Sequence, residues 1–169
     1  MSDKEHHEGC DCHREPTNEE LFASQADAKV NLACMWVSSD RLDAAEVHLA
    51  AASKLYDMSG LKDRLPTNYY FARSAIAQKR GQLKAALRHS RAAYAVARSH
   101  HAADSHQVAV AQANFGECLA ESGNKDKGLE VMAAGLAKLK AADVGCDPMM
   151  VAWKESAINE ISANIARLS

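Results

Sequence analysis

Aromatic residues, prolines and glycines are scarce in this chain of 169 residues: aromatics make up 5%, and there are three prolines and eight glycines. Much of the hydrophobic content is alanine, which combines the best helix propensity with a small side chain. Such a composition suits closely packed helices and does not suit a large β core. Few prolines and glycines also leave few points at which a helix must end. The composition therefore indicates an all-α fold.

Long apolar runs are also absent. No run approaches the roughly 18 residues of a membrane-spanning helix, and the acidic N-terminus lacks the apolar core of a secretory signal. The five cysteines are an odd number and do not follow the pattern of a small secreted domain, so we interpret them as reduced thiols. We expect a cytoplasmic protein without a membrane partner.

Charge is distributed unevenly along the chain, although the net charge is only −2. Residues 1–20 carry seven acids and two bases, whereas residues 64–103 carry eight Lys or Arg and no acid. The middle of the chain is therefore locally basic. Because aromatics are sparse and the overall charge is negative, we do not expect nucleic acid as a partner.

Helical spacing of apolar residues begins after residue 16, and residues 1–16 are predicted to be a flexible acidic tail. Seven helices with short connections are predicted beyond it. Their approximate ranges are 17–39, 41–59, 67–79, 82–99, 105–121, 124–141 and 148–168.

Local signals support several of these helix ends. Thr17 and Glu20 fit a capping box, in which each side chain bonds a free N–H of the first turn. Asp40 is expected to cap the second helix. Asp147 followed by Pro148 predicts the start of the last helix, since Pro is tolerated at the first helical position.

Three turns recur at a nearly constant spacing. Asp40, Gly81 and Gly123 each separate two predicted helices, and they lie 41 and 42 residues apart. A period in this range is typical of helical repeat proteins. We predict three antiparallel helical hairpins over residues 17–146, followed by a C-terminal capping helix over residues 147–169.

Other residues recur at fixed distances from these turns. Asn lies nine residues before the first and third turns, and small residues lie five and twelve residues after all three: Asn31 and Asn114; Ala45, Ala86 and Gly128; Ala52, Ala93 and Gly135. This pattern resembles the tetratricopeptide repeat (TPR), and its period is similar to that of the longer kinesin-light-chain repeats. The second repeat departs from it, with Ala72-Arg73-Ser74 in place of Asn-Leu-Ala, and Asp40 stands where Gly is typical. The alternative is a different antiparallel helical fold.

The resemblance implies a TPR-like α-solenoid and a non-enzymatic scaffold or adaptor. Its concave groove, formed by the first helix of each hairpin, would hold a peptide or helix of another protein. The residues carried over to this groove are Asn31, Cys34, Phe71, Gln78, Lys79, Asn114, Glu117 and Glu121. In the family such asparagines commonly bind the peptide backbone, because an amide both donates and accepts. Alternatively, they connect neighbouring helices. We find no catalytic motif and predict no enzyme activity.

The N-terminal tail contains a compact group of metal-ligand residue types: His6, His7, Cys10, Cys12 and His13. Thiols and imidazoles bind Zn²⁺ or Cu⁺. The spacing differs from the usual zinc knuckle, so a tail without metal is the other interpretation. The corresponding alternative function is a metal-handling or redox accessory protein whose helices dock a client. No other cofactor is expected.

A basic stripe is predicted on the fourth helix, where Lys84, Arg88, Arg91 and Arg98 share one face. It is either a solvated outer face or a dock for an acidic partner or the acidic tail. The apolar last helix also suggests a homodimer as one option for the oligomeric state.

Overall fold

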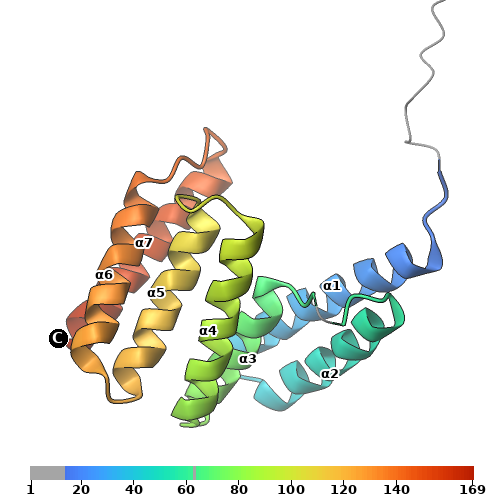
Figure 1. Cartoon of the computed structure of the whole chain (residues 1–169), viewed down its shortest axis with the longest axis horizontal. Coiled ribbons are helices and arrows are strands. Elements are labelled where there is room, and N and C mark those ends of the chain that lie inside the picture. The colour runs from blue at the N-terminus through green and yellow to red at the C-terminus, as the bar shows by residue number, and fades with distance from the viewer. Residues whose placement is uncertain (1–13, 63) are drawn as a thin grey trace, which may run out of the picture.

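The computed structural model describes residues 14–62 and 64–169, and this part of the chain is all-helical, as predicted. Figure 1 shows the helices following one another as successive pairs, with α7 beside the last pair. The seven helices of the described residues are α1 (Asn18–Ser38), α2 (Leu42–Met58), α3 (Thr67–Lys79), α4 (Leu83–His100), α5 (His106–Glu121), α6 (Lys125–Ala141) and α7 (Pro148–Leu168).

Packing is strongest within the pairs α1/α2, α3/α4 and α5/α6. Neighbouring pairs meet mainly where α1 contacts α3 and where α4 contacts α5, and α7 contacts both α5 and α6. Each helix therefore packs chiefly against helices that are close in the sequence. Within the described ranges, no helix is apolar and long enough to cross a bilayer.

The three repeated turns share one backbone geometry. Asp40, Gly81 and Gly123 have positive φ values of 59°, 68° and 102°. In each turn the N–H of the next residue bonds the carbonyl five residues back, as Arg41 does to Trp36 at 2.8 Å. This bond and the left-handed residue form a Schellman-type helix end.

The prediction that Asp40 caps α2 is wrong. Arg41 occupies the N-cap position and makes no side-chain cap bond. Because Asp40 is the left-handed residue that ends α1, the cap position falls one residue later. The Asp40 carboxylate instead accepts a hydrogen bond from Lys79 Nζ at 2.8 Å.

The other predicted helix starts are confirmed. Thr17 Oγ1 accepts from the Glu20 N–H at 3.2 Å, and the Glu20 carboxylate accepts from the Thr17 N–H at 2.7 Å. Asp147 accepts from the Met149 N–H at 2.9 Å, with Pro148 in the first turn. The N-terminal starts of α1 and α7 are therefore fixed by hydrogen bonds with nearby side chains.

Small residues allow the closest helix contacts. A methyl group added to Gly128 would lie 2.4 Å from the Ala120 nitrogen, and one added to Gly116 would lie 2.6 Å from the Met132 nitrogen. The backbones of α5 and α6 therefore touch. The repeated alanines Ala45 and Ala52 are also fully buried, and they belong to the same core cluster as Val30 and Ala33 of α1.

Candidate functional site

Three adjoining clefts run along α1, α3, α5 and α7. The first, of about 290 Å³, lies between α1 and α3. The central cleft, of about 320 Å³, lies between α3, α5 and α7 and shares Pro66 and Asn68 with the first. The third, of about 150 Å³, lies between α5 and α7 and shares Val110 and Trp153 with the central cleft. The shared residues make the three clefts one continuous surface, which we name the helix groove.

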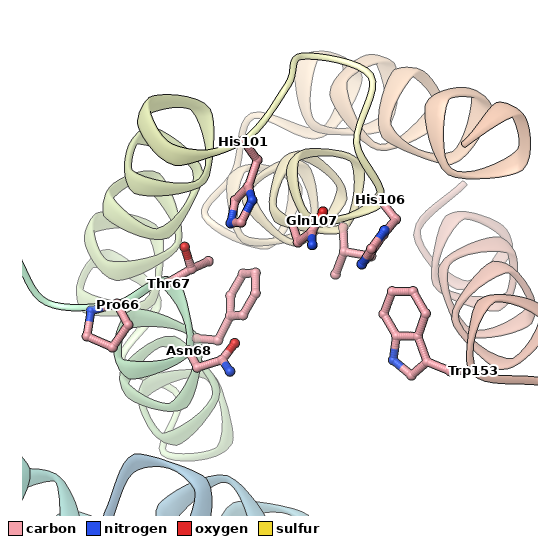
Figure 2. Close-up of a pocket in the computed structure, with 9 residues that line it drawn as sticks. Pro66, Thr67, Asn68, His101, His106, Gln107 and Trp153 are labelled. Atoms are coloured by element: carbon pink, nitrogen blue, oxygen red, sulfur yellow. The ribbon is translucent and has the colours of Figure 1, made fainter. Parts of the chain in front are cut away.

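The central cleft combines apolar walls with a polar rim (Figure 2). Phe71 and Val110 supply apolar surface, together with Trp153, a residue that is 40% exposed. Figure 2 shows Pro66, Thr67 and Asn68 on one flank of this cleft, and His106 and Trp153 on the other. The cleft is therefore open to solvent and large enough for one bulky side chain.

His106 forms the rim beside Trp153, with the two ring centroids 5.3 Å apart at 69°. Burial, and then the charge of His101, lower the pKa of His106 below its ordinary value. The imidazole is therefore predominantly neutral at pH 7, and in that form it presents one donor and one acceptor.

Each of the four groove helices contributes one asparagine to the clefts: Asn31 from α1, Asn68 from α3, Asn114 from α5 and Asn164 from α7. None of the four side-chain amides makes a hydrogen bond within the part of the chain that the structure describes. Four amides that both donate and accept therefore line one surface without a partner among the described residues.

The sequence pattern identified two of these asparagines and missed the other two. Ala72 is the α3 residue that matches Asn31 in the repeat. Asn68 lies one helical turn before Ala72, so Asn68 and Ala72 lie on the same face of α3. That shared face was the available signal. Asn164 belongs to α7, which has no following turn to place it in the repeat, so no sequence signal pointed to it.

Three of the predicted groove residues, Gln78, Glu117 and Glu121, take part in hydrogen bonds between helices. Gln78 Nε2 donates to the Glu121 carboxylate at 3.0 Å. Arg167 donates to Glu117 at 2.8 Å and to Glu121 at 3.2 Å. These bonds connect α3, α5 and α7. Burial and the neighbouring Glu121 raise the pKa of Glu117, and Arg167 partly offsets this.

The remaining predicted residues lie in different surroundings. Asn31, Phe71 and Asn114 line the first, central and third clefts respectively. Lys79 is exposed and paired with Asp40. Cys34 is half-buried, and its thiol contacts the Asn68 carbonyl oxygen at 4.0 Å.

The thiols of Cys34 and Cys118 lack the lowered pKa that is typical of reactive cysteines. Burial raises the pKa of both, so both are protonated at neutral pH. Cys118 Sγ also lies 3.4 Å from Ser74 Oγ in the interior. Cys34 and Cys118 therefore act as small packing residues.

The predicted metal ligands His6, His7, Cys10, Cys12 and His13 lie outside the described residues. Within residues 14–62 and 64–169, no group of three or more His, Cys, Asp or Glu side chains is arranged to hold a metal ion. Metal binding by the N-terminal tail stays a prediction from the sequence.

No family model, no curated protein and no solved structure matches this chain. Interpretation of the groove therefore depends on its own geometry. Its three main features are the four amides that have no partner among the described residues, the apolar central cleft and His106 on its rim.

Proposed function

We propose that this protein is a non-enzymatic adaptor that binds an extended peptide of another protein in the helix groove. The observation that carries the proposal is the row of four asparagine amides along α1, α3, α5 and α7, unbonded among the described residues. An extended peptide exposes N–H and C=O groups that have no partner within the peptide, and asparagine amides complement both.

The proposal includes a TPR-like solenoid of three hairpins, with α7 as the capping helix. Two features support it: the turns at Asp40, Gly81 and Gly123 share a left-handed residue, and packing proceeds between successive pairs. The first helix of each pair and α7 then line one surface, as the clefts indicate. Cys34, Cys118 and Cys146 are free thiols, which is typical of cytoplasmic proteins.

The two parts of the groove contribute differently to binding. A neutral hydrogen bond adds about 0.5–1.5 kcal/mol net, whereas burying a large apolar side chain adds about 1.5–3 kcal/mol. The central cleft therefore supplies the main anchor, against Phe71 and Trp153. The asparagines set the direction and register of the peptide.

A displayed library of random linear peptides provides the probe for this proposal. The tightest peptide is labelled, and its affinity is measured by fluorescence anisotropy. Asn68→Ala with Asn114→Ala is expected to weaken binding about tenfold or more, since two hydrogen bonds are lost. Trp153→Ala is expected to weaken it by at least as much.

Asn159→Ala is the matched control, because Asn159 is an exposed asparagine of α7 outside the three clefts. Its affinity should equal that of the wild type. Unchanged affinity in the Asn68/Asn114 double variant, with the helical circular dichroism signal preserved, would contradict the proposal.

A further inference from the structure

A separate cleft lies between α4 and α5 and shares no lining residue with the helix groove. Its volume is about 310 Å³, and it is lined by Lys84, Leu87, Arg88, Arg91, Phe115 and Leu119. We name this surface the basic cleft. Three of its six residues are cationic and three are apolar, so it differs in chemistry from the helix groove.

The cations of the basic cleft are available to a partner. Lys84, Arg88 and Arg91 are exposed, and none forms an ion pair or hydrogen bond with any residue that the structure describes. By contrast, Lys79 and Arg80, at the end of α3, pair with carboxylates of the α1–α2 region. Unpaired like charges on one helix face repel one another, so an external acid would relieve this repulsion.

The apolar part of the cleft is held in place by packing. The Phe115 ring stacks on Tyr94 with centroids 6.0 Å apart and an interplanar angle of 14°. Leu87 and Leu119 flank it and are half-buried. The floor is therefore a preformed apolar surface beside the cations.

We infer that the basic cleft docks an acidic amphipathic helix of another protein. Apolar side chains of that helix contact Leu87, Phe115 and Leu119, and its carboxylates pair with Lys84, Arg88 and Arg91. The three cations lie at steps of four and three residues on α4, so they span about 10 Å along the helix axis. Carboxylates with the same spacing on a partner helix cover the same length.

Charge complementarity alone would also admit a nucleic acid, but the floor favours a peptide. Single-stranded nucleic acid binds through bases stacked on exposed aromatic faces. Phe115 is half-buried and already stacks on Tyr94. Aliphatic side chains of a helix contact such a floor together with Leu87 and Leu119.

The test uses the full chain and a labelled synthetic helical peptide with Glu at three positions spaced four and three residues apart and Leu on the adjoining positions. Anisotropy should show binding that weakens with added salt. Replacing every Glu by Gln, or every Leu by Ser, should weaken binding about tenfold or more.

The protein variant Arg88→Glu with Arg91→Glu should also lose about tenfold or more. Lys54→Glu with Lys140→Glu is the matched control, because both lysines are exposed and lie outside the basic cleft. This control changes the net charge equally and should retain wild-type affinity. Both proteins are compared by circular dichroism to establish that the charge reversals leave the fold intact.

Three results would overturn the inference. The Gln peptide could bind as tightly as the Glu peptide, or a single-stranded DNA oligonucleotide could bind more tightly than either. A synthetic peptide of residues 1–20 could also bind more tightly than the designed helix, which would assign the cleft to the N-terminal segment of this chain. Failure of these tests would leave the helix groove proposal unaffected, because its library peptide and its variants are different.

Discussion

Asp40 has the backbone geometry that glycine adopts in the two later turns, with φ at 59°. A side chain in this region costs about 1 kcal/mol, although Asp tolerates it better than most residues. Its ion pair with Lys79 is exposed at both ends and contributes less than this.

We predict that Asp40→Gly raises the free energy of unfolding by about 0.5 kcal/mol, since release of backbone strain exceeds the other losses. Urea denaturation measures the change. Lys79→Ala serves as the control that isolates the ion pair. A larger loss of stability in Asp40→Gly than in Lys79→Ala would show that the Asp40 side chain stabilises the turn.

His89 makes folding dependent on pH. Burial lowers the pKa of this half-buried imidazole below its ordinary value of 6.5, and Arg88 and Arg73 lower it further. The unfolded chain therefore takes up a proton at a higher pH than the folded chain does. As pH falls below about 6.5, this proton uptake by the unfolded chain lowers the free energy of unfolding.

We expect His89→Gln to remove part of this decrease, because glutamine does not titrate. Denaturant midpoints measured from about pH 7.5 to about pH 5 would show a shallower slope than in the wild type. His106→Gln should act in the same direction, since burial also lowers the pKa of His106. An unchanged slope in both variants would contradict this account.

At the scale of elements, the contact between α5 and α6 depends on the absence of side chains. Alanine at position 128 would favour the helix by up to about 1 kcal/mol from propensity alone. Its methyl group, however, would lie 2.4 Å from the backbone of α5. We therefore predict that Gly128→Ala lowers stability by about 2 kcal/mol or more.

Thermal denaturation followed by circular dichroism measures this loss. Ala134→Gly on the exposed face of the same helix is the control, and it should cost at most about 1 kcal/mol. If Gly128→Ala proved more stable than the wild type, the close backbone contact would be wrong.

The elements predicted from the sequence are those whose signals are local. The caps at Thr17 and Asp147 and the left-handed glycines each involve only a few neighbouring residues, and α3 has the predicted bounds. Periodic small residues likewise indicated where helices approach. Asp40 was misassigned because two local rules, capping and left-handed termination, compete at one position.

The candidate site was less accessible to sequence reasoning, because it depends on how α7 packs. Trp153, Asn164 and Arg167 all lie on this helix and meet α3 or α5 residues that are distant in the chain. No repeat spacing relates α7 to the hairpins. Its contribution to the clefts therefore required the three-dimensional arrangement.

At the scale of the whole molecule, contacts between sequence neighbours imply that stability varies along the chain. Leu49 is fully buried in the core of α1, α2 and α3, whereas Leu139 is fully buried against α5 and α7. We predict that Leu49→Ala lowers stability by about 3 kcal/mol and speeds amide exchange mainly in α1 and α2.

Hydrogen exchange with mass spectrometry resolves this pattern by segment. Leu139→Ala is the reciprocal variant and should speed exchange mainly in α5, α6 and α7. Uniform acceleration in both variants would mean that the helices unfold as one cooperative unit.

The two tryptophans of the sequence give the protein two built-in optical probes. Trp36 lies under the Arg41 guanidinium, 4.4 Å from its ring centroid, in the first hairpin. Trp153 borders the central cleft beside His106. A side chain that enters the cleft displaces water from Trp153 and shifts its emission to shorter wavelength, while Trp36 supplies a constant background. Occupancy of the groove is therefore measurable on the unlabelled protein.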